Sequence, residues 1–140
     1  MRRLACLASA LLLAACATAP GRAPTLYEQL GGRDGIAAIT DRLLDAFAGD
    51  PLVAPAFRHV DIRRYRINFT DYLCQIADGP CHYTGDSMAE VHRGMHIDEA
   101  AFNAVVQDLI TAMDRQHVPV RVQNRLLARL APERKDIIYR

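Results

Sequence analysis

The segment that decides the fold reads Met-Ala-Glu-Val-His-Arg-Gly and spans residues 88–94. Met88 and His92 are four residues apart and therefore share one face of a short helix. Gly94, two residues after His92, allows the chain to leave the helix. This arrangement places one imidazole beside apolar neighbours, opposite the long amphipathic third helix. A lone histidine on a helix is usually a surface or structural residue, so these surroundings single out His92 among the five histidines.

The chain around this segment has helical periodicity throughout. Thr25 to Glu28 fits a capping box that opens a short helix, which Gly31-Gly32 ends. Asp61 and Asp98 are suited to cap two longer helices, and Pro119 starts the last helix. The apolar faces of the longer helices are expected within residues 36–47, 62–76, 102–113 and 122–130. Since no segment alternates like a strand, the sequence predicts an all-α fold with corners rich in glycine and proline.

The composition is that of a small single domain. The chain has 140 residues, of which 51% are hydrophobic, and its 17 Lys+Arg and 16 Asp+Glu give a formal net charge of +1. A nucleic-acid-binding domain needs a basic face, and electrostatic membrane binding needs a polybasic surface. Near-neutrality argues against both classes, and the hydrophobic content excludes a disordered chain.

The N-terminal segment is typical of an export signal rather than of a folded element. Arg2 and Arg3 precede an apolar run over residues 4–13, which is too short to span a bilayer as a stable helix. Leu13-Ala14-Ala15-Cys16 resembles the lipobox of bacterial lipoproteins. The resemblance implies that the Cys16 thiol takes a diacylglyceryl group and becomes an acylated N-terminus.

These features predict three segments and a location. Residues 1–15 are expected to be a lipoprotein signal peptide, residues 16–24 the lipidated Cys16 with a flexible tether, and residues 25–140 the folded domain. The residue after the lipidation site is Ala17 rather than Asp, which favours the outer membrane. We expect a lipoprotein of the bacterial cell envelope that faces the periplasm.

Two of the four cysteines, Cys74 and Cys81, lie in the folded domain. In an exported protein such a pair is a candidate disulfide, which would stabilise the fold by about 2–3 kcal/mol through loop closure. The alternatives are free thiols, or a zinc site shared with His59 and His82, although the spacing matches no standard zinc pattern.

Several motifs together resemble the group I truncated haemoglobins, the short two-over-two helical globins. The motifs are Leu26 to Gly32 (LYEQLGG), Asp50-Pro51-Leu52, Phe57, Gly79-Pro80, Tyr83-Thr84-Gly85, Met88, Val91 to Gly94 (VHRG), Ile97, Phe102, Val118-Pro119 and Leu130-Ala131-Pro132. The resemblance covers Thr25 to Ile138. It implies a truncated two-over-two globin fold that binds haem b.

The resemblance also implies roles for individual side chains. His92 becomes the proximal ligand of the haem iron, because a neutral imidazole in an apolar slot can hold that iron from one side. Phe57 becomes the phenylalanine that wedges against the haem face. Met88, on the same helix face as His92, joins the cofactor-binding set.

The distal side departs from the family pattern. The family commonly has a tyrosine in its second helix whose hydroxyl hydrogen-bonds bound oxygen, and a glutamine partner; the matching residues are Leu44 and Phe69, which donate nothing. Tyr65, one turn before Phe69, is the remaining candidate donor, and Asn68 stands where some relatives supply a polar contact. The distal pocket is therefore either apolar, so that the ligand dissociates fast, or it contains one hydrogen-bond donor, the Tyr65 phenol. The alternative for Tyr65 and Phe69 is an ordinary place in the core.

The remaining expectations concern the haem propionates and the activity. Arg66 and Arg93 are the candidate propionate partners, against the alternative that both are solvated surface arginines. We expect a haem protein that reversibly binds a diatomic gas, oxygen or nitric oxide, with a reductase as an unidentified partner. The main alternative is a haem enzyme at the same site, a nitric-oxide dioxygenase or a peroxidase-like enzyme; Leu44 disfavours the dioxygenase. A third is a lipoprotein that has lost haem and serves as an interaction module.

Overall fold

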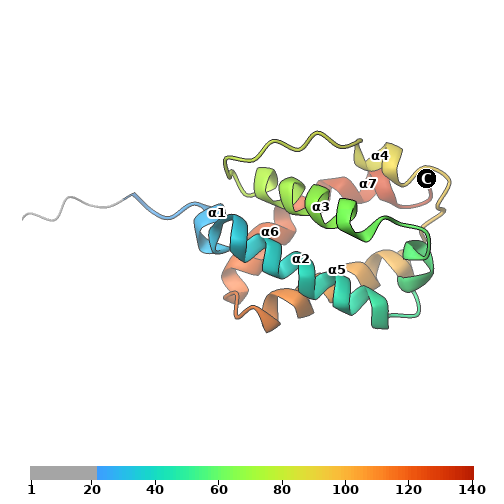
Figure 1. Cartoon of the computed structure of the whole chain (residues 1–140), viewed down its shortest axis with the longest axis horizontal. Helices are drawn as coiled ribbons and strands as arrows, with labels where there is room; N and C mark the ends of the chain where they lie inside the picture. The colour runs from blue at the N-terminus through green and yellow to red at the C-terminus, as the bar shows by residue number, and fades with distance from the viewer. Residues whose placement is uncertain (1–21) are drawn as a thin grey trace, which may run out of the picture.

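The computed structural model describes residues 22–140, which form an all-α domain (Figure 1). The predicted signal peptide and Cys16 lie outside the described residues. The elements are α1 (Leu26–Gln29), α2 (Gly32–Gly49), η1 (Ala54–Phe57), α3 (Ile62–Ile76), α4 (Met88–Val91), α5 (Glu99–Arg115), α6 (Val120–Leu130), η2 (Ala131–Glu133) and α7 (Arg134–Ile137). Residues 22–140 contain no strand, and none of their helices is both long and apolar enough to cross a membrane.

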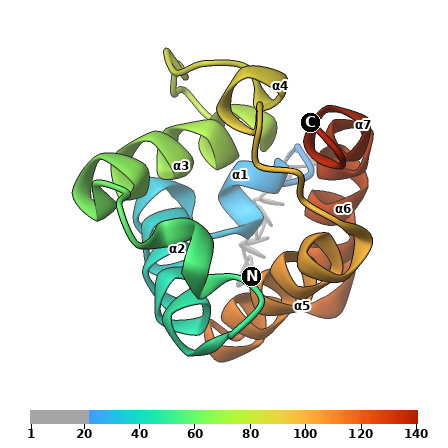
Figure 2. The ribbon, with the colours of Figure 1, turned by 90° about the vertical axis from the view of Figure 1, so that its right-hand side faces the viewer.

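The four long helices form two layers around one core. α2 packs against both α3 and α5, and α6 packs against α1, α3 and α5. Figure 2 shows α2 and α3 on one side of the domain, α5 and α6 on the other, and α4 above them near α7. The most deeply buried core side chains are Leu26, Ile36, Ile39, Leu43, Leu73, Cys74, Met113 and Leu126.

Side-chain caps fix where the helices begin. Thr25 and Ser87 each form a capping box with a glutamate three residues later, which starts α1 and α4. Asp61 and Asp98 accept hydrogen bonds from backbone N–H groups in the first turns of α3 and α5. The three caps expected at Thr25, Asp61 and Asp98 are confirmed.

The C-terminal end differs from the sequence prediction, because α6 is followed by the short η2 and α7 helices. Pro132 lies in the first turn of η2. Backbone N–H groups in a first turn have no partner within the helix, so the proline costs no hydrogen bond there and a new helix can start. The backbone N–H of Tyr139 then donates to the Ile97 carbonyl, and that of His96 donates to the Arg140 carbonyl. The last residues therefore run beside the segment that connects α4 to α5.

A disulfide holds the connection between α3 and α4. Cys74 at the end of α3 and Cys81 in the following loop are bonded, with their Cα atoms 5.8 Å apart. Of the three states that the sequence left open, a disulfide, free thiols or a zinc site, the structure contains the disulfide. In the described part of the chain, no group of three or more His, Cys, Asp or Glu side chains is placed to hold a metal ion such as zinc.

The turn from α1 to α2 requires glycine at position 35. A Cβ atom added to Gly35 would overlap the carbonyl oxygen of Leu30. We expect Gly35→Ala to lower the free energy of unfolding by about 1–3 kcal/mol, because the backbone of this turn must shift. Chemical denaturation followed by circular dichroism measures the change.

Gly49→Ala is the matched control in the same helix. A Cβ atom at Gly49 would have no neighbour within 4 Å, so this variant should keep or slightly raise the stability. Equal stability of the two variants would contradict the close approach at Gly35.

Candidate functional site

His92 lies at the C-terminal end of α4, and one of its two ring nitrogens is occupied. Its Nδ1 atom is 2.8 Å from the carbonyl oxygen of Met88. Because a carbonyl oxygen only accepts, Nδ1 carries the proton and donates, which leaves the Nε2 lone pair free. The ring is partly buried. Nε2 is therefore available to bind a metal, and the helix cap fixes the orientation of the ring.

A row of aromatic rings runs along α3. The Phe57 ring from η1 meets the Tyr65 ring edge-on, with centroids 5.1 Å apart, and Tyr65 stacks on Phe69 at 5.4 Å. The complete aromatic row consists of Phe47, Phe57, Tyr65, Phe69, Tyr72 and Tyr83. Phe57, Tyr65 and Phe69 pack against the core but are only partly buried. Part of their surface is thus free to contact a further apolar group.

The three tyrosines of the row differ in what their hydroxyl groups contact. The Tyr83 hydroxyl donates to the Asp86 carbonyl at 2.8 Å, and the Tyr72 hydroxyl is buried without a partner in the described residues. Burial raises the pKa of the Tyr65 phenol far above its usual range, and Tyr83 adds to the shift. No residue within 22–140 forms a hydrogen bond with the Tyr65 hydroxyl. Tyr65 is therefore a protonated donor with no protein acceptor.

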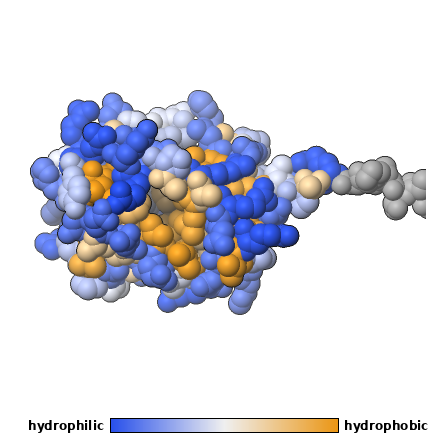
Figure 3. Space-filling view, turned by 180° about the vertical axis from the view of Figure 1, so that it is seen from behind, coloured by the Kyte–Doolittle hydropathy of each residue, from blue (hydrophilic) through white to orange (hydrophobic). Residues whose placement is uncertain are grey.

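Leu44 is placed on the α2 side of the same region. Leu44 and Phe57 line a cavity of about 380 Å³ between α2, η1 and the start of α3. The other lining residues are Asp45, Phe47, Ala48, Ala54, Arg58 and Ile62. The cavity brings together two of the predicted site residues, and His92 is not among its lining residues. Figure 3 shows apolar side chains gathered on one face of the domain, with hydrophilic ones around them.

The two candidate propionate partners have different surroundings. Arg66 is engaged by Asp41 of α2, with two hydrogen bonds between guanidinium and carboxylate, one of 2.8 Å. This pairing lowers the pKa of the Asp41 carboxyl. Arg93 is exposed and forms no ion pair within the described residues. Asn68, the other polar candidate on α3, is partly buried.

Sequence reasoning missed the contacts that position α4 and the disulfide. The capping box at Ser87 was readable from the Ser-x-x-Glu spacing, and it fixes the start of the helix that carries His92. The Arg33 guanidinium pairs with Asp71, which is 38 residues away in the chain, and also reaches Cys81. No local pattern signals such a contact, because it depends on how α2 and α3 pack.

Comparison with known proteins gives consistent similarities. Residues 25–138 match the family described as Bacterial-like globin. The group 1 truncated haemoglobin of Tetrahymena pyriformis is 29% identical over 114 residues, which are 81% of this chain and 94% of that protein. A group 1 truncated haemoglobin of a Nostoc species is 35% identical over 89 residues, 64% of this chain and 75% of that protein.

Solved structures show the same similarity in three dimensions. The Fe(III) form of the Tetrahymena pyriformis truncated haemoglobin has a TM-score of 0.81 and 28% identity, covering 84% of this chain and 100% of that one. The 2/2 haemoglobin of a Synechococcus species has a TM-score of 0.77 at 18% identity, over 82% of this chain and 98% of that one. The fold class expected from the sequence is confirmed.

The spacing of three side chains can be compared directly with one of these proteins. Variant structures of the Tetrahymena pyriformis protein replace a tyrosine and two glutamines that follow it by 21 and 25 residues. Leu44, Tyr65 and Phe69 have the same spacing in this chain. By this spacing, Leu44 stands in place of the tyrosine and Phe69 in place of the second glutamine, so both positions are apolar in this chain. Tyr65 stands in place of the first glutamine.

Proposed function

This chain belongs to the bacterial-like globin family and has the truncated two-over-two globin fold, and we propose that it holds haem b through His92 and reversibly binds oxygen or nitric oxide. Membership of the family supports haem binding by a globin. The observation that carries the proposal is the His92 ring, whose Nδ1 proton is held by the Met88 carbonyl so that Nε2 is free.

The residues present fit haem. Haem supplies an iron atom that takes an axial imidazole and can bind a small diatomic molecule. His92 offers an imidazole whose Nδ1 is engaged by the Met88 carbonyl, so Nε2 is the ring nitrogen that would hold the iron. Leu44, Phe57, Phe69 and Met88 offer partly buried apolar surface that a porphyrin ring could cover.

Tyr65 is the proposed hydrogen-bond donor to the gas ligand. The Tyr65 hydroxyl keeps its proton, because burial raises the pKa of the phenol. No described residue accepts a hydrogen bond from this hydroxyl. A donor without an internal acceptor in a partly buried site can donate to a ligand. Leu44 and Phe69 then exclude water from the ligand rather than contacting it through hydrogen bonds.

The exposed Arg93, close to His92 in the chain, is the proposed partner of one propionate. Arg66 is the second candidate, and it would have to share its guanidinium between a propionate and Asp41. Both contacts would orient the cofactor from the rim of the site.

Haemin added in equal amount to the protein tests the proposal. We expect a Soret band in the ferric form and, after reduction, a visible spectrum that changes reversibly when oxygen is admitted and removed. A spectrum identical to that of free haemin would overturn haem binding. Consumption of nitric oxide over many turnovers with an added reductase would favour a dioxygenase instead.

We further propose that the protein is exported and anchored through lipid on Cys16 at the bacterial cell envelope, facing the periplasm. The lipobox-like residues Leu13 to Cys16 support the anchor. The Cys74–Cys81 disulfide supports export, because disulfides persist in oxidising compartments.

A change at Cys16 is expected to block lipidation and processing of the precursor. Cys16→Ser removes the thiol that would take the lipid, so the unprocessed precursor should accumulate, as it should when the wild type is treated with globomycin. Mass spectrometry of the purified protein measures both effects. Cys6→Ser, inside the same signal segment, is the control and should be processed normally. Normal processing of Cys16→Ser would refute the anchor.

A further inference from the structure

We propose that the Cys74–Cys81 disulfide is a reducible latch on the α3–α4 loop (residues 77–87), and that its exchange with an external dithiol loosens the hold on haem. The proposal rests on the proposed haem site at His92. It assigns a thiol-exchange site that lies outside the haem pocket, with a dithiol as the reacting class of molecule.

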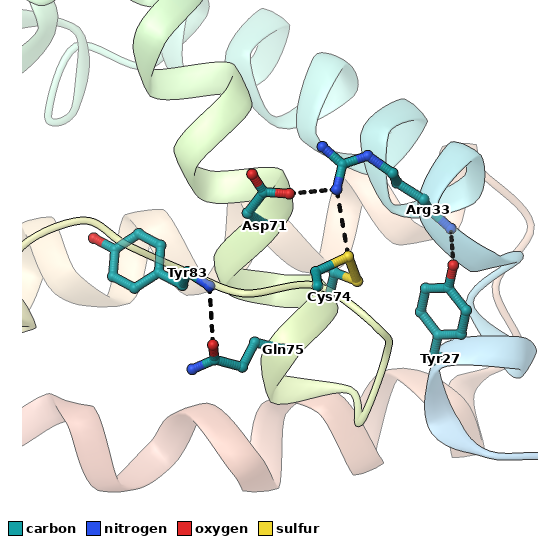
Figure 4. Close-up of a disulfide and its surroundings, with 7 residues drawn as sticks. Tyr27, Arg33, Asp71, Cys74, Gln75 and Tyr83 are labelled. Atoms are coloured by element: carbon teal, nitrogen blue, oxygen red, sulfur yellow. Dashed lines mark hydrogen bonds and ion pairs between the residues drawn. A yellow bond between two sulfur atoms is a disulfide. The ribbon is translucent and has the colours of Figure 1, made fainter.

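The second half of the loop has only two attachments to the helices. Within residues 80–86 of the described chain, only Cys81 and Tyr83 pack against the core. The backbone N–H of Tyr83 donates to the Gln75 side chain at 2.9 Å, and its ring lies against Tyr72 with centroids 5.3 Å apart. Cys81 is the other attachment, through the disulfide to α3 (Figure 4).

The first half of the loop is held independently of the disulfide. The Ala77 carbonyl accepts from the Tyr27 N–H at 2.9 Å, and the Gly79 N–H donates to the Cys74 carbonyl at 2.8 Å. Asp78 forms an ion pair with Arg129 of α6. Opening the disulfide therefore leaves Tyr83 as the remaining attachment of residues 80–86, without releasing the end of α3.

The two sulfur atoms differ in accessibility. Cys74 is completely buried, and a Cβ atom at Gly79 would come within 2.6 Å of its Sγ atom, so the loop backbone covers this sulfur closely. Cys81 is partly exposed. An incoming thiolate would therefore attack Sγ of Cys81.

A positive charge stands beside the attacked sulfur. The Arg33 Nη1 atom lies 3.4 Å from the Cys81 Sγ atom, and the same nitrogen pairs with Asp71 (Figure 4). The Arg33 side chain is half exposed, so it does not block approach from solvent. A guanidinium at this place stabilises the negative charge that develops on sulfur during exchange.

The exchange is balanced in electrons and protons. The dithiol's thiolate bonds to Cys81 Sγ, the Sγ–Sγ bond breaks, and its electron pair leaves on Cys74 Sγ, which takes a proton. The second thiol of the reagent then attacks the reagent's own sulfur in the mixed disulfide and releases Cys81, which takes the second proton. The protein gains two electrons and two protons, and the dithiol becomes a disulfide.

The loosened segment leads directly to the iron ligand. His92 follows Cys81 by 11 residues, and α4 begins at Met88 immediately after the loop. With the latch open, Tyr83 alone holds the loop while α4 keeps its contacts with α7, so the position of α4 against α3, and with it that of the His92 Nε2 atom, is less fixed. A poorly oriented axial ligand binds metal more weakly.

Haem transfer to an excess of apomyoglobin tests the latch. Wild-type protein is reduced with dithiothreitol under nitrogen and gel-filtered before haemin is added, and is compared with the oxidised protein. We expect haem to leave the reduced form about tenfold faster. Loss of a group that orients a metal ligand typically lowers metal affinity by about 10–100-fold, and this expectation is at the lower end of that range. The Cys74→Ala/Cys81→Ser variant should match the reduced form and should not respond to dithiothreitol. Equal rates for oxidised and reduced protein would overturn the proposal.

Hydrogen exchange of the haem-free protein separates this proposal from the haem proposal. Reduction should speed exchange of the Tyr83 amide, which donates to the Gln75 side chain, while the amides of α2 and α5 keep their protection. Protection of the Tyr83 amide that survives reduction unchanged would overturn the latch, as would a loss of protection throughout the domain. If no haem binds at all, the proposed function fails, and the exchange data still decide whether the latch opens.

The role of Arg33 has its own measurement. The rate at which dithiothreitol releases thiols should fall about two- to fivefold in Arg33→Gln, the effect of one solvent-exposed charge, and should be restored in Arg33→Lys. Arg125→Gln is the matched control, because Arg125 is also an exposed arginine with a side-chain hydrogen bond, to Gln29, but it does not contact the disulfide. An unchanged rate in Arg33→Gln would remove Arg33 from the exchange step.

Discussion

Replacing His92 with alanine should lower the affinity for haem by more than about 100-fold and abolish the sharp Soret band of protein-bound haem. The Nε2 atom of His92 is the proposed bond to iron, and even the loss of a group that orients a metal ligand costs 10–100-fold in affinity. The alanine variant keeps the capping box at Ser87 and the core of the domain, so circular dichroism should show an intact fold.

Two further variants make this result specific. In His92→Gly, imidazole added to the solution can occupy the vacated position, and it should restore the Soret band. His96→Ala is the matched control, because His96 is exposed and contributes only its backbone N–H to the Arg140 carbonyl. A His92→Ala protein that binds haem as tightly as the wild type would overturn the assignment of the proximal ligand.

Replacing Tyr65 with phenylalanine should speed oxygen dissociation by about 10- to 100-fold. A hydrogen bond to a partly charged ligand contributes about 1.5–3 kcal/mol, and Leu44 and Phe69 offer no second donor. Because burial raises the pKa of the Tyr65 phenol, its proton should remain in place at alkaline pH, and the wild-type rate should stay constant there. Stopped-flow mixing with carbon monoxide measures the rate.

Tyr72→Phe is the matched control for this prediction. Tyr72 belongs to the same aromatic row, and its hydroxyl is buried without a partner in the described residues, so removing it should leave oxygen dissociation unchanged and stability equal or higher. If Tyr65→Phe also left the rate unchanged, Tyr65 would be an ordinary core residue and the distal pocket would be apolar.

The long helices were predictable because each buries a continuous apolar face. Residues 36–47 and 102–113 repeat apolar side chains at helical spacing, and aspartates 61 and 98 stand where α3 and α5 begin. α7 was not predictable in this way. Its four residues, Arg134–Ile137, carry no apolar repeat, and their helix depends on the preceding turn at Pro132 and on contacts with α4.

The candidate site was predictable in its residue types and not in its contacts. The Met88-to-His92 spacing placed both residues on one helix face, and the structure adds that the Met88 carbonyl fixes the ring. The Arg66 pairing with Asp41 joins α2 and α3 across 25 residues of chain. Such a pair depends on how the two helices are rotated against one another, which local periodicity does not determine. The cysteine pair was visible, but only the folded loop brings the two sulfur atoms together.

The aromatic row also determines how this protein responds to ultraviolet light. The chain has no tryptophan, and Tyr65, Tyr72 and Tyr83, three of its five tyrosines, stand in that row. Its intrinsic fluorescence is therefore tyrosine emission, and three of the five emitters belong to the aromatic row that contains Tyr65, the proposed donor to the ligand. A bound porphyrin would quench this emission, so tyrosine fluorescence should fall when the cofactor binds and rise when it dissociates.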